Sequence, residues 1–439
     1  MYFIDQRIQV IANQMGNLRF RDKVELNDWQ YKHGQFFRPS EADASTAPWL
    51  TFDSKKNHWY AEYAGTDQFE GKFTGQNTDF HGIPGSHYWF RTTATVPQSF
   101  HGKSVWMKIR TQIEEWDDGK NPQFLIFVNG EVRQGADINH REMLLFREAK
   151  AGTEITLDIQ AYTGTLHREF NFLAELYELD ENLNQLYYDL QVPLWAFGRL
   201  DKDDKIRLDM QTVLNETINL LDMRVPHSKA FDESVEKAIA YIGENLYEKM
   251  GGYDDIIATC IGHTHIDVAW WWTVAQTREK VARSFATVLK LMEEYPEYKF
   301  MSSQPVLYYF LGQRYPELLE KIKERVKEGR WKLVGGWFIQ PDCNIPCGES
   351  FARHALITQR YFEEKFGVMA QTGYNVDSFG HNGNLPMILQ NSRMKNYVFM
   401  RPGPHEKTIP NSLFTWVYTL SVIENHFKQL FLASSFCWS

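Results

Sequence analysis

The sequence predicts a multidomain protein of β plus α/β class: an N-terminal β-sandwich, a helical linker, and then a region of alternating strands and helices. Three observations support this prediction. Short alternating strands recur from about 83 to 164, helical spacing follows between 208 and 250, and strand–helix alternation begins at residue 256. The 439 residues, 43% of them hydrophobic and 15% aromatic, can bury two or three substantial cores.

Residues 1–82 are rich in aromatic residues, glycine and aspartate, and they show no clean periodicity. We expect an irregular lead-in that packs on the sandwich. Exposed rings in this segment could bind sugars, but covering a core is the commoner use of such residues. We therefore assign no site to it.

The sandwich is predicted over residues 83–190, with a jelly-roll-like arrangement. Its predicted strands cover 87–96, 104–110, 123–128 and 154–161. Val105, Met107 and Ile109 alternate with other residues, as in a strand with one buried face. Asn129 and Gly130 follow an apolar run, and this pair is a strong signal for a tight hairpin.

Residues 191–255 are predicted to form a helical linker between the sandwich and the region that follows. Apolar residues recur at helical spacing between 208 and 250, in two groups. The segment 232–234 is a plausible start for the second helix, and the glycines at 251 and 252 are a natural stop.

Residues 256–416 alternate between strands and helices, beginning with a buried strand at 256–262. Predicted helices cover 277–294, 316–328, 349–366 and 385–394, and further strands cover 331–338, 371–376 and 397–400. Such alternation indicates a parallel sheet or barrel, in which ligands bind beyond the carboxyl ends of the strands. Four polar clusters fall at strand ends, at 263–267, 340–344, 377–384 and 401–405.

The first cluster has the residue types of a metal site. Extended backbone would place His263, His265 and Asp267 on one face at a strand end. Imidazole nitrogen and carboxylate oxygen are common zinc ligands. The alternative is that the histidines cap a strand and the tryptophans at 270–272 fill a core; spacing alone leaves both interpretations open.

The other clusters also allow more than one role. Asp377 can complete a metal site, attack a substrate or cap a turn. His381 is expected to orient Asp377 or a loop carbonyl. Asp342 can bind substrate, act as an acid or hold a turn. Arg401 can pair with Asp377, grip a substrate oxygen or lie on the surface.

Four segments of this region closely resemble family 38 glycoside hydrolases, the class II α-mannosidases, of the cytosolic and vacuolar type. They are 262–270, 335–337 with Asp342, 377–381 and 399–405, in the family's order. The resemblance implies a seven-stranded β/α barrel, of which 256–416 would be the N-terminal part. It also implies a divalent metal ion, with zinc preferred and cobalt as the alternative.

The resemblance further implies a role for each matching residue. His265 and Asp267 would be metal ligands, and Asp377 would be both ligand and nucleophile. His263 is not a ligand in the family pattern. The expected activity is metal-dependent, retaining hydrolysis of terminal α-mannosides from oligosaccharides or glycans. The residues expected to bind the substrate are Trp270, Phe379, Arg401 and Asp342.

Beyond residue 416 the sequence departs from the family pattern, and 417–439 is expected to be an aberrant tail. The family's fourth metal ligand and its acid/base aspartate would lie downstream of Ser439. We therefore expect a C-terminally truncated form, caused by a frameshift or a gene-prediction error, with low or no activity.

Two other classes of function remain open: a metal-dependent polysaccharide deacetylase, in which metal-bound water replaces Asp377 as nucleophile, and a non-catalytic carbohydrate-binding remnant. The formal net charge of -9 and the lack of a basic stripe argue against nucleic-acid binding. No window predicts a membrane span or secretion signal, and the four cysteines form no C-x-x-C pairs. We expect a cytoplasmic protein and leave homo-oligomerisation open.

Overall fold

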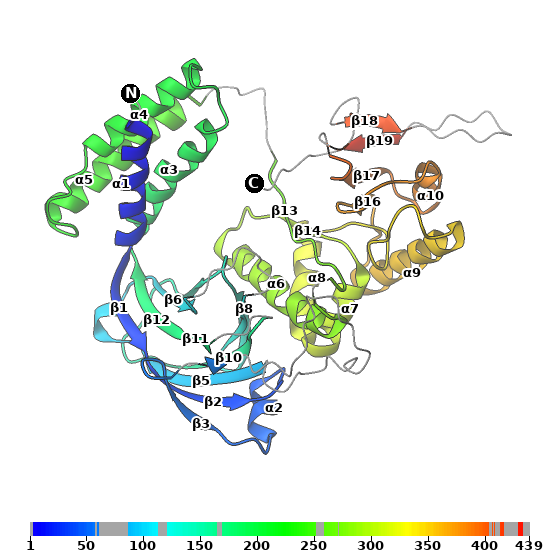
Figure 1. Ribbon diagram of the computed structural model, residues 1–439, viewed down its shortest axis with the longest axis horizontal. Helices are drawn as coiled ribbons and strands as arrows, with labels where there is room; N and C mark the ends of the chain where they lie inside the picture. Colours follow the sequence, from blue (N-terminus) through cyan, green and yellow to red (C-terminus); the bar gives the residue numbers. More distant parts are fainter. Residues whose placement is uncertain are drawn as a thin grey trace.

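The computed structural model describes residues 3–57, 59–60, 87–112, 121–164, 169–251, 259–270, 272–403, 406, 408, 413–416 and 429–432. They form a helical bundle, a β-sandwich and an α/β region (Figure 1). None of the helices in these ranges is long and apolar enough to cross a membrane.

The sandwich consists of two antiparallel sheets around one apolar core. The six-stranded sheet has the order β3 (Leu50–Asp53), β2 (Asp28–His33), β5 (His87–Thr95), β10 (Glu154–Tyr162), β7 (Gln123–Val128) and β8 (Glu131–Ala136). The four-stranded sheet has the order β1 (Phe20–Leu26), β12 (Leu173–Leu179), β6 (Val105–Arg110) and β9 (Glu142–Phe146). Phe90 of the first sheet and Leu176 of the second lie in the same buried cluster. The four strands predicted here correspond to β5, β6, β7 and β10.

The hairpin predicted at Asn129 and Gly130 joins β7 to β8. Both residues have positive φ, 52° and 83°, as a two-residue turn of this hand requires. Glycine adopts this backbone without a steric penalty, and asparagine tolerates it better than most residues.

The expectation of an irregular segment over 1–82 is wrong for its described part. Residues Ile4–Leu18 form helix α1, which buries Ile8, Ala12 and Met15 at spacings of four and three. The same segment contributes β1, β2, β3, the short helix α2 (Pro39–Ala44), and β4 (Trp59–Tyr60), which pairs with β11 (Glu169–Phe170). The strands are short, β2 buries the charged Lys32, and β3 exposes Leu50, so the alternation is hard to recognise in the sequence.

The predicted linker is part of a helical bundle that starts earlier in the chain than expected. Its helices are α1, α3 (Glu181–Phe197), α4 (Lys205–Asn219) and α5 (Lys229–Ile242), followed by the π-helical turn η3 (Gly243–Glu248). They share one apolar core. Asp180 caps α3 by accepting the backbone N–H of Leu183 at 3.0 Å, and Ser228 rather than a residue at 232–234 caps α5.

The described part of the α/β region contains five parallel strands in chain order. These are β13 (Gly262–His263), β14 (Phe300–Ser302), β15 (Trp331–Leu333), β16 (Thr372–Asn375) and β17 (Asn396–Phe399), and a bridge between Gly335 and Gly373 joins the first three to the last two. The helices of this region are α6 (Val274–Glu294), α7 (Pro305–Arg314), α8 (Pro316–Lys327), α9 (Gly348–Phe366) and α10 (Leu385–Asn391). Chain-order pairing is the arrangement found in a β/α barrel.

Three details of this region differ from the predictions. The strand expected at 256–262 is limited, among the described residues, to its last position and His263; Ile261 is 45% exposed, because β13 is an edge strand paired with β14. Strand β14 and helix α7 were not predicted, since both are short and mostly buried. Within the expected tail, Gln429–Leu432 form β19, which pairs with β18 (Leu413–Trp416).

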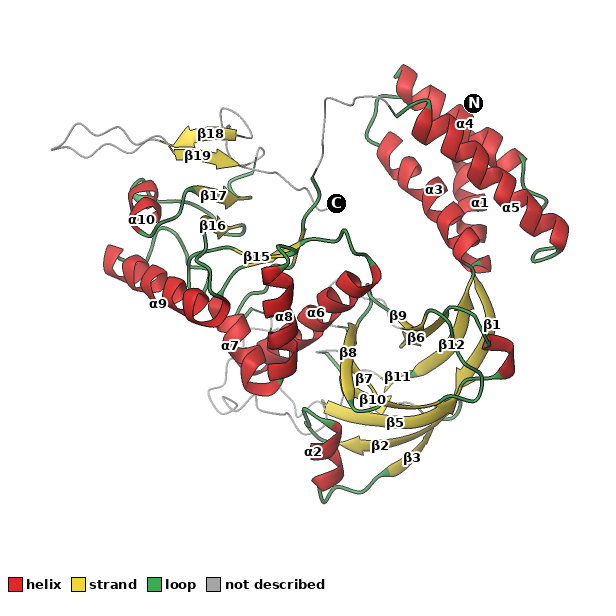
Figure 2. Ribbon diagram, turned by 180° about the vertical axis from the view of Figure 1, so that it is seen from behind, coloured by secondary structure: helices red, strands yellow, loops and turns green. Residues whose placement is uncertain are grey.

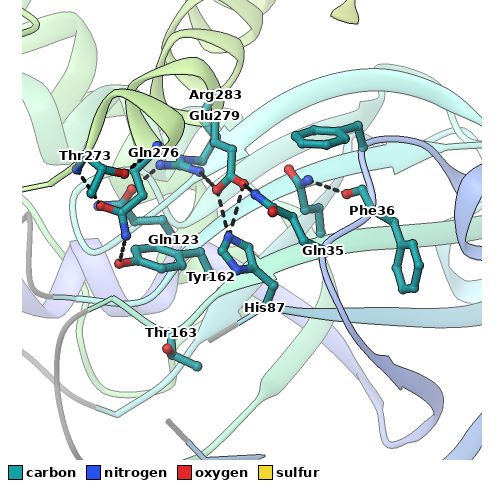
Figure 3. A network of polar contacts seen from close by, with 12 residues as sticks. Gln35, Phe36, His87, Gln123, Tyr162, Thr163, Thr273, Gln276, Glu279 and Arg283 are labelled. Carbon is teal, nitrogen blue, oxygen red and sulfur yellow. Dashed lines mark hydrogen bonds and ion pairs between the residues drawn. The ribbon is translucent and has the colours of Figure 1, made fainter. Parts of the chain in front are cut away.

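Helix α6 lies between the parallel strands and the sandwich (Figure 2) and is attached to the sandwich by buried polar side chains. The carboxylate of Glu279 lies 3.1 Å from Nε2 of His87 in β5, and it accepts a hydrogen bond from Gln35 Nε2 at 2.5 Å (Figure 3). Arg283 lies 3.7 Å from Glu279 and donates to Gln123 of β7. The helix that follows the 263–267 cluster therefore has a fixed place on the sandwich.

Candidate functional site

The loop after β13 carries two of the expected ligands side by side. His265 Nε2 lies 3.2 Å from Asp267 Oδ1. Ile266 between them is 1% exposed and belongs to the core of the α/β region. Burial of this one side chain orients the backbone so that its two neighbours remain partly open to solvent.

Hydrogen bonds to three consecutive carbonyl groups hold this loop. The side chain of Gln304 donates to Ile266 at 2.8 Å, and the indole of Trp272 donates to Asp267 at 3.2 Å. The hydroxyl of Thr277, in the first turn of α6, donates to Val268 at 2.6 Å. Because α6 is fixed on the sandwich, the position of the loop depends on that interface as well.

Asp377 comes from a different strand end and meets the same loop. It follows β16, and its Oδ2 lies 4.0 Å from His265 Nε2. Its other oxygen, Oδ1, accepts from Arg401 Nε at 2.8 Å. The two expected ligand-bearing segments therefore converge, and one carboxylate oxygen of Asp377 is held while the other faces His265.

Arg401 follows β17, and its side chain contacts three groups among the described residues. Besides Asp377, its Nη1 lies 3.6 Å from Glu406 Oε1, and its guanidinium carbon lies 4.9 Å from the ring centre of Phe379. Glu406 also accepts the backbone N–H of Gly403 at 2.7 Å. Sequence reasoning missed Glu406, because one acidic residue in a loop carries no periodic signal.

His381 contacts a loop carbonyl, one of the two roles expected for it. Its Nε2 lies 2.7 Å from the carbonyl oxygen of Arg401, and the hydroxyl of Tyr397 lies 2.9 Å from its Nδ1. Because a carbonyl only accepts, Nε2 must carry the proton and Nδ1 accepts from the tyrosine. Burial lowers the pKa of His381, which favours this neutral form.

His263 does not join the other two residues of its motif. Its Nδ1 donates to the carbonyl of Met301 at 3.0 Å, and its ring packs edge-on against Tyr374. Burial lowers its pKa to about 4, so it is neutral at pH 7. The alternation argument fails for His263 because the strand ends there and the following residues are not extended in a ladder.

Asp342 occupies a turn. Its Oδ1 accepts from the backbone N–H groups of Asn344 and Ile345, at 2.7 and 2.9 Å. These two bonds lower the pKa of this exposed carboxyl group. Of the three roles left open by the sequence, this geometry is that of the turn residue.

Large apolar side chains lie open to solvent on the same segments. Trp270 is 62% exposed and Phe379 is 72% exposed. Trp270 meets the ring of Trp272 edge-to-face, with 5.8 Å between centroids. Exposed aromatic surface of this size beside polar groups is typical of a binding site.

The donor types of His265, Asp267 and Asp377 suit a divalent metal ion, although the atoms are not gathered closely enough in this structure to surround one. Ligands about 2.0 Å from a tetrahedral ion are about 3.3 Å apart, and ligands on opposite sides of a larger coordination shell are about 4 Å apart. Asp267 Oδ1 and Asp377 Oδ2 lie 3.2 and 4.0 Å from His265 Nε2, but the three donor atoms are not all within 4.8 Å of one another, so the two carboxylates would have to move closer together to share one ion. One nitrogen and two carboxylates are also the ligand types that zinc and cobalt accept.

A second group of possible ligands lies far from this loop, in the contact between the sandwich and the helical bundle. Asp180, His227 and Asp232 each offer an atom within 4.8 Å of the others. However, the guanidinium of Arg21 forms ion pairs with both carboxylates. A cation of the protein itself therefore occupies this position, and we assign no metal to it.

Comparison with known proteins gives a consistent picture. Residues 255–421 match the family model described as glycosyl hydrolases family 38 N-terminal domain. The chain is 29% identical to alpha-mannosidase G of Dictyostelium discoideum over 81% of its own length, and 27% identical to human alpha-mannosidase 2C1 over 75%. It is 34% identical to an alpha-mannosidase of Saccharomyces cerevisiae over 36% of its length, which is 15% of that protein.

The chain spans about a third of the length of the first two relatives, 33% and 32% respectively. The matched part includes β13 to β17 and therefore the whole group formed by His265, Asp267, Asp377 and Arg401.

Proposed function

Because residues 255–421 belong to glycosyl hydrolases family 38, we propose that this chain carries the metal-binding and nucleophile-bearing part of a retaining α-mannosidase site. One observation carries the proposal: Asp377 lies within 4.0 Å of His265 and is held by Arg401 at 2.8 Å, although the three residues come from three strand ends. The substrates we propose are terminal α-mannosides of oligosaccharides or glycans, as the names of the relatives suggest.

Asp377 would act through Oδ2, the oxygen that Arg401 Nε does not hold. Attack on the anomeric carbon forms an ester bond to Asp377 and breaks the bond to the leaving oxygen, which takes a proton from an acid. Water then hydrolyses the ester, and two inversions give net retention. The acid/base group is not assigned to a described residue, so the proposal covers the first bond change.

His265, Asp267 and Asp377 would hold the divalent metal ion. When bound, such an ion supplies Lewis-acid stabilisation and orients sugar hydroxyl groups. The chain's own contribution is a supported loop: the carbonyls of Ile266, Asp267 and Val268 are already hydrogen-bonded, which limits the movement of the backbone that carries His265 and Asp267.

Trp270 and Phe379 would contact the apolar face of the sugar ring. Their exposure of 62% and 72% leaves their faces accessible. Arg401 lies over Phe379 as well as beside Asp377, so one guanidinium would fix both the ring and the nucleophile. We propose Asp342 as a more distant substrate contact, secondary to its turn.

The five parallel strands in chain order support the seven-stranded β/α barrel that the resemblance implies. We also propose a cytoplasmic setting. Cys260, Cys343 and Cys347 are free thiols, which is the usual state of cysteine in a reducing compartment.

Hydrolysis of a 2,4-dinitrophenyl α-mannoside tests the proposal. The dinitrophenolate leaves without protonation, so the first step can be measured even if the acid is not present in this chain. We expect dinitrophenolate release that needs added zinc or cobalt and that is lost in Asp377→Asn. Asp209→Asn, on the exposed side of α4, is the matched control and should keep the wild-type rate.

Two outcomes would contradict the proposal. Metal-dependent release of acetate from an acetylated polysaccharide, unchanged in Asp377→Asn, would indicate a deacetylase. Mannose binding by calorimetry without any release of dinitrophenolate would indicate a carbohydrate-binding remnant.

A further inference from the structure

A buried glutamine lies between the two halves of the site. Gln304 follows strand β14, the neighbour of both β13 and β15, and is 3% exposed. Its backbone is left-handed, with φ of 65°, which is uncommon for any residue but glycine. Such a backbone persists only where surrounding contacts hold it, so the position of this side chain is strongly determined by its neighbours.

Both ends of the Gln304 amide are used. Its Nε2 donates to the carbonyl of Ile266 at 2.8 Å, between the expected ligands His265 and Asp267. Its oxygen accepts the backbone N–H of Gln340 at 3.0 Å. The side chain therefore spans from the loop after β13 to the loop after β15.

The side chain of Gln340 continues this connection to Asp377. Two donors, the backbone N–H groups of Val376 and Asp377, face its amide. With its oxygen toward them, Gln340 accepts both, at 3.2 and 3.1 Å. The amide must take this orientation, since its NH₂ group would otherwise face two other donors.

We propose that Gln304 and Gln340 are positioning residues that set the separation between the His265–Asp267 loop and Asp377. The path runs from the Ile266 carbonyl through Gln304 to Gln340, and from Gln340 to the N–H of Asp377 itself. Neither glutamine touches the reacting atoms. This inference rests on the proposed function, because it assigns these three residues to one metal site.

The physical reason is that ligands on separate loops need a common support. A metal ion binds tightly only if its ligands are held near their final positions, and loss of an outer hydrogen bond typically weakens metal affinity about 10- to 100-fold. The same support fixes the nucleophile, for which displacement by about 1 Å is costly in rate.

Amide hydrogen exchange measures the connection without a metal ion. In Gln340→Met the N–H groups of Val376 and Asp377 lose their acceptor, and we expect their exchange to be roughly tenfold faster or more. Gln304→Met should also accelerate exchange at Val376 and Asp377, because it releases the backbone of Gln340.

Gln359→Met is the matched control. Gln359 is 6% exposed and likewise bridges backbone groups, donating to Ala370 and Ser392 at 2.8 and 3.0 Å. Gln359→Met should lower the denaturation midpoint about as much as Gln304→Met does. It should leave amide hydrogen exchange at Val376 and Asp377 unchanged. If Gln304→Met fails to fold, the less buried Gln340→Met carries the test.

Cobalt affinity, measured by competition with a chromophoric chelator, is the second measurement. We expect Gln304→Met and Gln340→Met to bind cobalt about tenfold or more weakly, and Gln359→Met to bind as the wild type does. Unchanged exchange at Val376 and Asp377 in both test variants would overturn the inference. A wild-type chain that binds no cobalt would instead contradict the proposed metal site, and exchange alone would then decide the positioning role.

Discussion

Replacing Glu279 by glutamine should destabilise the contact between the sandwich and the α/β region. The Glu279 side chain is 2% exposed, and it is paired with His87 at 3.1 Å and with Arg283 at 3.7 Å. The variant keeps the size of the side chain and removes its charge. The change therefore isolates the ionic part of the network drawn in Figure 3.

The expected loss in free energy of unfolding depends on the surroundings of Arg283 once the charge of Glu279 is removed. The Arg283 side chain is 9% exposed, so without Glu279 its charge stays buried, with the neutral amide of Gln123 as hydrogen-bond acceptor and the carboxylate of Asp137 as the remaining anion that acts on it. Removing one partner of a buried ion pair costs about 3–5 kcal/mol, because the other charge is left uncompensated. A domain is stable by only about 5–15 kcal/mol, so this is a large fraction of the total.

Urea denaturation combined with hydrogen exchange in α6 and β5 measures this cost. Because the chain has several cores, exchange in these elements is more informative than a single global midpoint. The control is Glu349→Gln, which removes an exposed pair with Arg353 and should cost less than about 0.5 kcal/mol. The double variant Glu279→Gln/Arg283→Met should recover part of the loss, since no charge is left unpaired.

The reasoning would be refuted if Glu279→Gln unfolded within about 1 kcal/mol of the wild type. It would also be refuted if the double variant lost more free energy of unfolding than the two single variants lose together. The two residues would then not compensate each other.

Four further predictions concern the site. Arg401→Lys should slow dinitrophenolate release about 10- to 100-fold, because one charge-assisted hydrogen bond contributes about 1.5–3 kcal/mol. Because Asp342 is proposed as a substrate contact, Asp342→Asn should slow release by more than about threefold, although the amide can still accept both turn hydrogen bonds; release within about threefold of wild type would identify a turn residue only. Burial lowers the pKa of His381 below 6.5, so its neutral form adds stability above pH 6.5, and this stability is lost as the pH falls. His381→Gln removes the titrating group. Its free energy of unfolding, measured by denaturation, should therefore fall less than that of the wild type between pH 7.5 and 5.5. Gly336→Ala should destabilise by more than about 1 kcal/mol in the same assay, since φ is 71° and a Cβ would lie 2.0 Å from Met394 Cε.

The parts of the fold that the sequence predicts well are those with one buried face. Strand β6 alternates at Val105, Met107 and Ile109, and Asn129 and Gly130 mark the hairpin. Helix α1 was missed although Ile8 and Ala12 have helical spacing, because polar residues dominate around them. Strand β14 and helix α7 lack a periodic pattern because they are mostly buried.

The proximity of several site residues could be predicted from the sequence, whereas their roles as ligands, nucleophile and substrate contacts stay predictions. Strand-end reasoning grouped the polar clusters, and the structure brings His265, Asp267, Asp377 and Arg401 together. Spacing alone could not exclude His263 from the ligand set, because the residue at which β13 ends depends on its pairing with β14. Gln304 was missed because it follows β14, and that strand was itself not predicted.

The most direct test of the central claim is covalent labelling with a fluorinated mannosyl fluoride. Fluoride leaves without an acid, and the second fluorine slows hydrolysis of the ester, so the labelled residue can be located by tandem mass spectrometry of its peptide. The proposal predicts one mannosyl label on Asp377, dependent on metal and lost in Asp377→Asn. A label on another carboxylate, or a wild-type chain that binds metal and mannose and is never labelled, would contradict it.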